Sequence, residues 1–298
     1  MRNRRASFCG LVLLLAGAAS ARAGMKVYVS VDLEGVAGVV TGDQLGPPGF
    51  EYERFRGFMT NEALAAVDGA RAAGATEFVV SDSHGNGESL LIERFPKDVT
   101  IVRSWPRPLA MMQGIDGSFA AVLFVGYHAS TGNPEGVRAH TMSSATLADV
   151  RLNGVSVPEA GINAAVAGHF GVPVVLITGD DAIVKEAQGL LPGIESVTVK
   201  WAYGFHSART LTPEAACERI REAARKAVGR AKDVAPYRVA EPVTLDLRFK
   251  NYRPAEVLAY LPGVVRTDAH AIRFRARDVL EAVQFLEFVT NYEPGLSP

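Results

Sequence analysis

Two carboxylates, Asp32 and Glu34, stand close together after a short apolar run at residues 26–31. The run is rich in β-branched and aromatic side chains and is soon followed by Gly35, which is typical of a buried strand that ends at a turn. Because side chains alternate between the faces of a strand, Ser30, Asp32 and Glu34 are expected on the same face. Paired carboxylates at the end of an apolar strand repel each other and are costly to desolvate, so a divalent metal between them is the simplest explanation. The alternative is that both merely begin a solvated loop.

Three of the six histidines lie in glycine-containing loops: His84, His128 and His140. His84 and His128 come at or just beyond the ends of predicted strands, as Asp32 and Glu34 do. In an open α/β sheet these carboxyl ends line one edge, where ligands bind. A single loop histidine is more often solvated than a ligand, but several from separate strands favour a metal site. Imidazole and carboxylate ligands suit zinc, with manganese or cobalt as substitutes.

Other acidic residues have simpler explanations in the sequence. Glu159 opens a predicted helix, where a negative charge is favourable by about 0.3–1 kcal/mol, and the residues alone favour that role. Asp180 and Asp181 also follow a strand, but helix capping explains Asp181, and the pair is expected at most to support the site from outside. Three further histidines are left out of the site: His169 lies at a predicted helix end and is expected to be structural, and His206 and His270 have no partner visible in the sequence.

The elements that would position these residues alternate between strand and helix. Strands are predicted at residues 26–31, 76–81, 99–102, 119–125, 148–152, 155–157, 174–178 and near 197, and helices at 55–73, 159–167, 181–190 and 213–231. This alternation predicts an α/β domain with a mostly parallel, doubly wound sheet over residues 24–235. Beyond it, a strand, a helix, a hairpin and a last helix predict a smaller C-terminal α+β lobe over residues 236–298.

The N-terminus has the three parts of a secretory signal peptide. Arg2, Arg4 and Arg5 form a basic start, an apolar run follows, and the segment 21–23 (Ala-Arg-Ala) is a small-residue cleavage site. We expect cleavage after Ala23, export to the periplasm or medium, and no membrane anchor afterwards. Met25 is an alternative start, which would give a cytoplasmic protein.

Composition excludes several classes of protein. The chain has 298 residues, of which 48% are hydrophobic and 21% charged, an ordinary globular composition. Removing residues 1–23 takes four of 31 basic residues and leaves 27 against 32 acidic ones, a net charge of −5. This acidic balance, without a basic stripe, argues against nucleic-acid binding. Cys217 is then the one remaining cysteine, which excludes a disulfide framework.

Five segments of the chain, taken together, resemble the DppA-type zinc D-aminopeptidase family. They are Ser-Val-Asp-Leu-Glu-Gly at 30–35, Ser-Asp-Ser-His-Gly at 81–85, Gly-Tyr-His-Ala at 126–129, Ala-His-Thr at 139–141, and Asn-Gly with Glu-Ala-Gly-Ile-Asn between 153 and 163. They come in the family's order and near its spacing, and the resemblance spans about residues 25 to 290.

The resemblance implies an aminopeptidase with two zinc ions per subunit, acting on short peptides. It implies five metal ligands, namely Asp32, Glu34, His84, His128 and Glu159, and a catalytic role for His140. It also implies an α/β domain with a smaller C-terminal lobe, assembled into a ring-like homo-oligomer with a decamer as the candidate size. The export signal departs from the family's founding member.

These residue types make chemical sense of the implied site. Three carboxylates against two Zn²⁺ leave a local charge of about +1, enough to hold a hydroxide at neutral pH. The two oxygens of Asp32 could each serve one ion. His140 could pass a proton to the leaving amine, or act as a nucleophile.

The leading hypothesis is therefore a zinc aminopeptidase that releases N-terminal residues, D-amino acids by the family's precedent. A second hypothesis is another amidase or a phosphoesterase that uses the same two metals. A third is a protein that binds peptide or metal without catalysis, since a fold does not guarantee a function.

Overall fold

A seven-stranded sheet lies at the centre of the computed structural model, which describes residues 24–292. The predicted signal peptide lies outside the described residues. The sheet order is β3-β2-β1-β4-β7-β8-β9, and every pair is parallel except β8 with β9. Its strands are β1 (Met25–Val31), β2 (Ala75–Asp82), β3 (Val99–Val102), β4 (Ala121–Tyr127), β7 (Val174–Asp180), β8 (Glu195–Gly204) and β9 (Ser207–Thr210).

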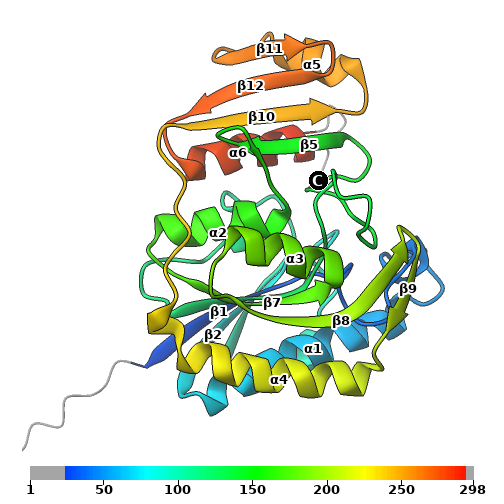
Figure 1. Ribbon diagram of the computed structural model, residues 1–298, viewed down its shortest axis with the longest axis vertical. Helices are drawn as coiled ribbons and strands as arrows, with labels where there is room; N and C mark the ends of the chain where they lie inside the picture. Colours follow the sequence, from blue (N-terminus) through cyan, green and yellow to red (C-terminus); the bar gives the residue numbers. More distant parts are fainter. Residues whose placement is uncertain (1–23, 293–298) are drawn as a thin grey trace, which may run out of the picture.

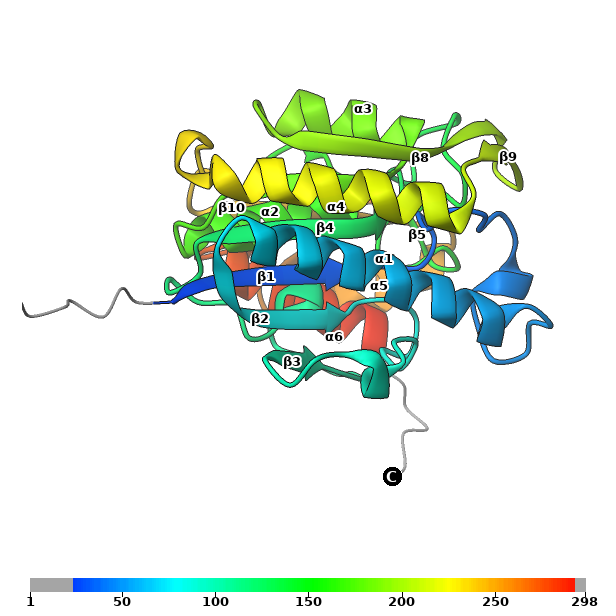
Figure 2. The ribbon, with the colours of Figure 1, turned by 90° about the horizontal axis from the view of Figure 1, so that it is seen from below.

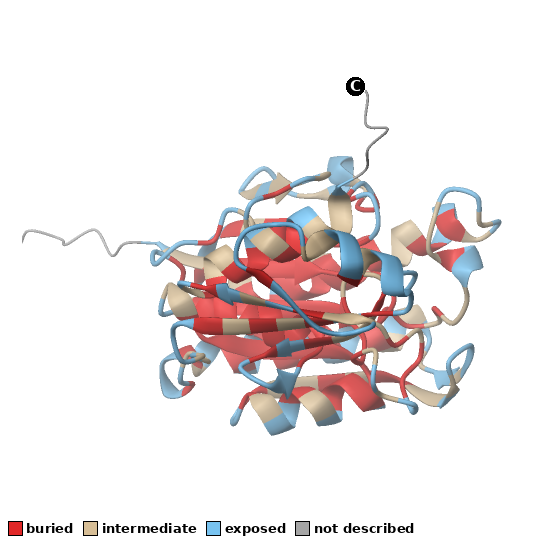
Figure 3. Ribbon diagram, turned by 90° about the horizontal axis from the view of Figure 1, so that it is seen from above, coloured by how far each residue is buried: buried red, intermediate tan, exposed pale blue. Residues whose placement is uncertain are grey.

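Helices cover both faces of this sheet (Figures 1 and 2). Helices α1 (Tyr52–Ala72) and α4 (Pro213–Gly229) lie side by side across one face, and α2 (Glu159–His169) and α3 (Asp181–Leu190) cover the other. Short 3-10 turns complete this part: η1 (Gly42–Gln44), η2 (Ile92–Arg94), η3 (Ala110–Met112) and η4 (Ala231–Asp233). Because both faces are covered, strands β4 and β7 are buried at every residue, as Figure 3 shows for the interior. The prediction of a mostly parallel, doubly wound sheet is confirmed.

A second, antiparallel sheet forms the smaller lobe, in the order β11-β12-β10-β5-β6. Its strands are β5 (Leu147–Leu152), β6 (Val155–Ser156), β10 (Val243–Phe249), β11 (Val264–Asp268) and β12 (Ala271–Ala276), with helices α5 (Tyr252–Leu258) and α6 (Val279–Asn291). Helix α6 lies between this sheet and α2 (Figure 1).

The predicted boundary at residue 235 does not separate the two sheets. The β5–β6 hairpin lies in the middle of the chain, yet β5 pairs with β10 of the C-terminal segment. Val150 of β5 faces Leu247 of β10, and both are buried in one apolar cluster, which holds the hairpin in the second sheet. The smaller lobe is therefore built from two separate stretches of chain.

Within residues 24–292, no helix has both the length and the apolar character needed to cross a membrane.

Candidate metal centre

Three neighbouring strands end at the candidate site. Asp32 directly follows β1, His128 directly follows β4, and His84 comes two residues after β2. Strand β1 lies between β2 and β4. Strands β2 and β3 extend the sheet on one side of β1, and β4, β7, β8 and β9 extend it on the other, so the strand order reverses at β1. A crevice forms at such a switch point, outside the carboxyl ends of the strands. The sequence prediction that these side chains share one edge is confirmed.

Two glycines let the loop after β1 pass close to the end of β4. The Gly35 N–H donates to the Gly126 carbonyl at 2.7 Å. A Cβ on Gly35 would lie 2.0 Å from the Tyr127 carbonyl oxygen, and one on Gly126 would lie 2.2 Å from the Asp32 carbonyl oxygen. Larger residues at either position would push the backbone of the carboxylate pair away from His128.

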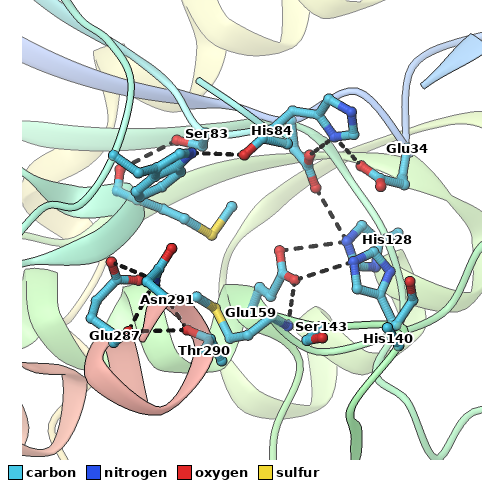
Figure 4. Close-up of a pocket in the computed structure, with 17 residues that line it drawn as sticks. Glu34, Ser83, His84, His128, His140, Ser143, Glu159, Glu287, Thr290 and Asn291 are labelled. Atoms are coloured by element: carbon cyan, nitrogen blue, oxygen red, sulfur yellow. Dashed lines mark hydrogen bonds and ion pairs between the residues drawn. The ribbon is translucent and has the colours of Figure 1, made fainter. Parts of the chain in front are cut away.

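One half of the centre consists of Glu34 and His84, which face each other in Figure 4, together with Asp32. The His84 Nδ1 atom lies 2.7 Å from Glu34 Oε2 and 3.3 Å from Asp32 Oδ1. All three side chains are buried. The two carboxylates and the imidazole therefore converge on a single small volume.

The other half consists of His128 and Glu159, again with Asp32. The His128 Nε2 atom lies 3.2 Å from Asp32 Oδ2 and 3.4 Å from Glu159 Oε2. Glu159 is the first residue of α2, and its other oxygen accepts from the Met142 N–H at 2.7 Å. Glu159, which the residues alone assigned to the helix terminus, thus also faces the centre.

His140 joins the second half from the loop after β4. Its ring stacks on His128 with centroids 4.1 Å apart, and its Nε2 lies 3.7 Å from Glu159 Oε1. It is the most accessible of the six predicted site residues, with a side chain 15% exposed. His140 is therefore positioned to contact both the centre and a ligand in the cavity.

Backbone carbonyls orient all three imidazole rings. The carbonyl of Leu45 accepts from His84 Nε2 at 2.7 Å, that of Ala129 from His128 Nδ1 at 3.1 Å, and that of Arg138 from His140 Nδ1 at 2.8 Å. Since a carbonyl can only accept, each of these nitrogens carries the proton. The opposite nitrogen of each ring faces the carboxylates, as in metal sites whose outer contacts fix the tautomer.

The pKa shifts of the carboxylates and imidazoles show that this buried cluster has an excess of negative charge. Burial and the Glu34 carboxylate raise the pKa of Asp32. Burial also acts to raise the pKa of Glu34, but His84 holds it well below its usual value. Against their own burial, the pKa of His84 is raised by Glu34 and Asp32, and that of His128 by Glu159 and Asp32. The carboxylates therefore stabilise a cation at this point.

Two atoms of the cluster fit a metal better than a hydrogen-bond network. Asp32 Oδ2 and His128 Nε2 are buried and have no hydrogen-bond partner among the described residues. Two sets of ligand atoms also lie close enough to hold an ion, one from Asp32, Glu34 and His128 and the other from His128, His140 and Glu159. Buried polar atoms are costly without partners, and carboxylate oxygens with imidazole nitrogens form a donor set suited to zinc.

The cluster forms one wall of a cavity of about 340 Å³. All six predicted site residues line it. The cavity is also lined by Trp105, by Met111 and Met142, and by three residues of α6, namely Glu287, Thr290 and Asn291. The sequence did not point to the α6 residues, because their place in the cavity depends on how the smaller lobe packs.

A buried lysine, Lys200 of β8, supports the loop that carries Glu34. Its ammonium group donates to the carbonyls of Glu34, Val36 (3.1 Å) and Val39 (2.7 Å). Glu62 of α1 accepts from the Ala37 N–H of the same loop at 2.9 Å. No local pattern in the sequence points to either residue, since both lie outside the loop and reach it only through the fold.

Asp180 supports the loop that carries His140. Its carboxylate accepts from the Val137 N–H at 2.7 Å and from the Ile183 N–H, at the start of α3, at 2.9 Å. The helix cap is therefore Asp180, and the assignment of this role to Asp181 was wrong. Asp181 accepts from the Ala202 N–H of β8 instead.

The histidines left out of the site do not line the cavity: His169, His206 and His270.

Comparisons with known proteins point to one family. The model of the peptidase M55 family, described as D-aminopeptidase, matches residues 25–288. The D-aminopeptidase of Bacillus subtilis strain 168 is 34% identical over 271 residues, which cover 90% of this chain and 97% of that protein. The solved structure of the Zn-dependent D-aminopeptidase DppA from Bacillus subtilis, described as a self-compartmentalizing protease, has a TM-score of 0.86 and 33% identity. That match covers 89% of this chain and 97% of the solved one.

Proposed function

This chain belongs to the peptidase M55 family of D-aminopeptidases, and from that premise we propose that it is a binuclear zinc aminopeptidase. It would release the N-terminal residue, a D-amino acid, from short peptides. Family membership supports the class of enzyme, and the geometry of the centre supports the two-metal form.

The observation that carries the two-metal form is the placement of Asp32. One of its oxygens faces the half with Glu34 and His84, and the other faces the half with His128 and Glu159. Each half then has one imidazole, one further carboxylate and one oxygen of Asp32. These five side chains would hold the two zinc ions. Bound zinc supplies Lewis acidity toward the scissile carbonyl and lowers the pKa of water.

His140 is the residue best placed to move a proton. Its Nδ1–H is held by the Arg138 carbonyl, which leaves Nε2 at the cavity side near Glu159. Nε2 can accept a proton and deliver it to the amine that leaves when the peptide bond breaks. The same atom could instead act as a nucleophile or as an additional ligand, and substitution of His140 separates these roles.

The lining of the cavity favours a peptide over a phosphoester. No Lys or Arg is among the described residues that line it. Phosphate sites ordinarily use such side chains or a helix N-terminus. A role limited to binding is disfavoured by His140, which lies beside the five proposed ligands with a free nitrogen toward the cavity.

We further propose a homo-oligomer and an exported protein. The described self-compartmentalizing assembly of the DppA relative supports an oligomer, for which a ring of ten subunits is a candidate. The basic start, apolar run and cleavage site of residues 1–23 support export.

Alanine release from D-Ala-D-Ala and from L-Ala-L-Ala tests the proposal, using zinc-loaded residues 24–298 and a chelator-treated control. We expect zinc-dependent release from the D-peptide. Release from the L-peptide alone would keep the metallopeptidase and reject the D preference, and release from neither would reject the peptidase.

A further inference from the structure

Helix α6 of the smaller lobe places a buried carboxylate, Glu287, in the wall of the cavity that holds the metal centre. Glu287 is 6% exposed, and the mechanism above makes no use of it. In Figure 4 it lies with Thr290 and Asn291 on the side of the cavity away from His84 and His128. A second, more apolar hollow shares Glu287 and Asn291 in its wall, so the carboxylate lies where the two spaces meet.

The Glu287 carboxylate forms no direct ion pair with the described residues. Its side-chain partner in the described part of the chain is Asn291, whose Nδ2 donates to Oε2 at 3.2 Å. Among residues 24–292, no Lys, Arg or His lies within ion-pair distance of it. The nearby Arg107 guanidinium is used elsewhere, because it donates to Ser81 Oγ at 2.9 Å and to the Asp82 carbonyl at 2.7 Å.

Such a group is costly for the protein in the absence of a ligand. Burial raises the pKa of Glu287 to about 7, and Arg107 only partly offsets this effect. A carboxylate withdrawn from water loses hydration that the Asn291 contact and the nearby Arg107, which is engaged elsewhere, only partly replace. Within the described part of the chain, no Lys or Arg lines the cavity on the side of the metal centre, and Arg107, which lines the adjoining hollow, already donates to Ser81 and Asp82. A compensating cation on the side of the metal centre would therefore have to arrive with the ligand.

We propose that Glu287 binds an ammonium group of the substrate and so takes part in substrate selection. The proposal rests on the proposed function, since every aminopeptidase substrate carries an α-ammonium group and some carry a second one on a lysine-type side chain. The carboxylate supplies the charge, and Asn291 holds it in place. The two ammonium groups have the same chemistry but lie at different distances from the scissile bond. Peptides with and without a lysine-type side chain therefore show which of the two Glu287 binds.

The test compares Glu287→Gln with wild type, both zinc-loaded and covering residues 24–298. The substitution keeps the shape of the side chain and removes its charge. Glu256→Gln is the matched control, because Glu256 is an exposed carboxylate of the same lobe that forms no ion pair with any residue between 24 and 292. The substrates are D-Lys-D-Ala, its uncharged analogue D-norleucyl-D-Ala, and D-Ala-D-Ala. Zinc content and thermal unfolding are measured on every variant.

If Glu287 binds the side-chain ammonium, the substitution lowers the ratio of kcat/KM for D-Lys over D-norleucine at least tenfold and leaves D-Ala-D-Ala unchanged. If it binds the α-ammonium, kcat/KM falls at least tenfold for all three peptides, mainly through KM. Either result, with normal zinc content and normal Glu256→Gln kinetics, supports the proposal.

Glu287→Gln kinetics within twofold of wild type on all three peptides would overturn the proposal. So would loss of zinc or of folded protein, which would assign Glu287 a structural role. If the proposed function is wrong, wild type itself cleaves none of the three peptides, which distinguishes that result from a failure of the Glu287 proposal. In that case the affinities of wild type and Glu287→Gln for the same peptides are measured at equilibrium. Weaker binding by Glu287→Gln would support the proposal, and equal affinities would reject it.

Discussion

Asp32 presents one carboxylate oxygen to His84 at 3.3 Å and the other to His128 at 3.2 Å. The two histidines come from strands on opposite sides of β1, so this one side chain joins the two halves of the centre. Its position depends on the end of β1 and on the close passage of the following loop over β4. The sheet, rather than a single motif, thus builds the site.

Lys200→Met should weaken zinc binding in the half that contains Glu34. The substitution keeps the length of the side chain but removes three hydrogen bonds to the loop at residues 34–39. Changes to such outer contacts typically cost about 10–100-fold in metal affinity. Competition titration with a zinc chelator measures the effect. Lys185→Met, at a side chain 83% exposed, is the control and should bind zinc as wild type does. Equal affinities for Lys200→Met and wild type would contradict this role.

His140→Gln should retain both zinc ions and lose catalytic rate. A positioned acid or base typically contributes about 10²–10⁴-fold, so kcat should fall within that range while KM changes little. Steady-state kinetics and zinc analysis on the same preparation make the measurement. Loss of one zinc ion would instead identify His140 as a ligand, and an unchanged kcat would exclude it from catalysis.

Glu62 should make stability decrease as the pH rises from about 4.5 to 7. Burial raises its pKa from 4.5 to about 7, with Lys200 and the Ala37 N–H only partly opposing. In that pH window the unfolded chain has released the proton that the folded chain still holds, so ionisation opposes folding as the pH rises. The shift corresponds to about 3 kcal/mol.

Denaturant unfolding of wild type and Glu62→Gln at several pH values checks this dependence. Between pH 4.5 and 8 the free energy of unfolding of wild type should fall relative to that of Glu62→Gln. Glu256→Gln should follow wild type. Parallel curves for wild type and Glu62→Gln would show that the Glu62 carboxyl does not titrate as described.

Zinc should stabilise the fold, because it would relieve repulsion among three buried carboxylates. Zinc at about 100 times its dissociation constant adds about 2.7 kcal/mol per site, which is several degrees in Tm for a chain of this size. Thermal unfolding of chelator-treated protein with increasing zinc gives the curve. A Tm independent of zinc would count against a metal site in the folded state.

Much of the site could be predicted from local sequence, and the reason is geometric. Asp32, His84 and His128 each follow an apolar run that forms a strand of its own, and parallel strands end at a common edge. Only the resemblance to a family places Glu159 in the candidate site, since its own surroundings in the sequence are those of a helix start.

What the sequence did not reveal depends on contacts between distant segments. In the sequence, Lys200 is a single charged residue within a predicted strand. Its contact with the loop after β1 depends on the folded arrangement of the strands. In the sequence, Glu287 is a polar position of an amphipathic helix. It lines the cavity only because α6 packs beside it. Local alternation identifies the two strands of the β5–β6 hairpin without showing which sheet they join, so the sequence alone places the hairpin in the larger domain.

Anomalous scattering from crystals at the zinc edge tests the central claim most directly. We predict two peaks per subunit, one among Asp32, Glu34 and His84 and one among Asp32, His128 and Glu159, with Asp32 in contact with both. A single peak, or two peaks that Asp32 does not share, would contradict the proposed centre.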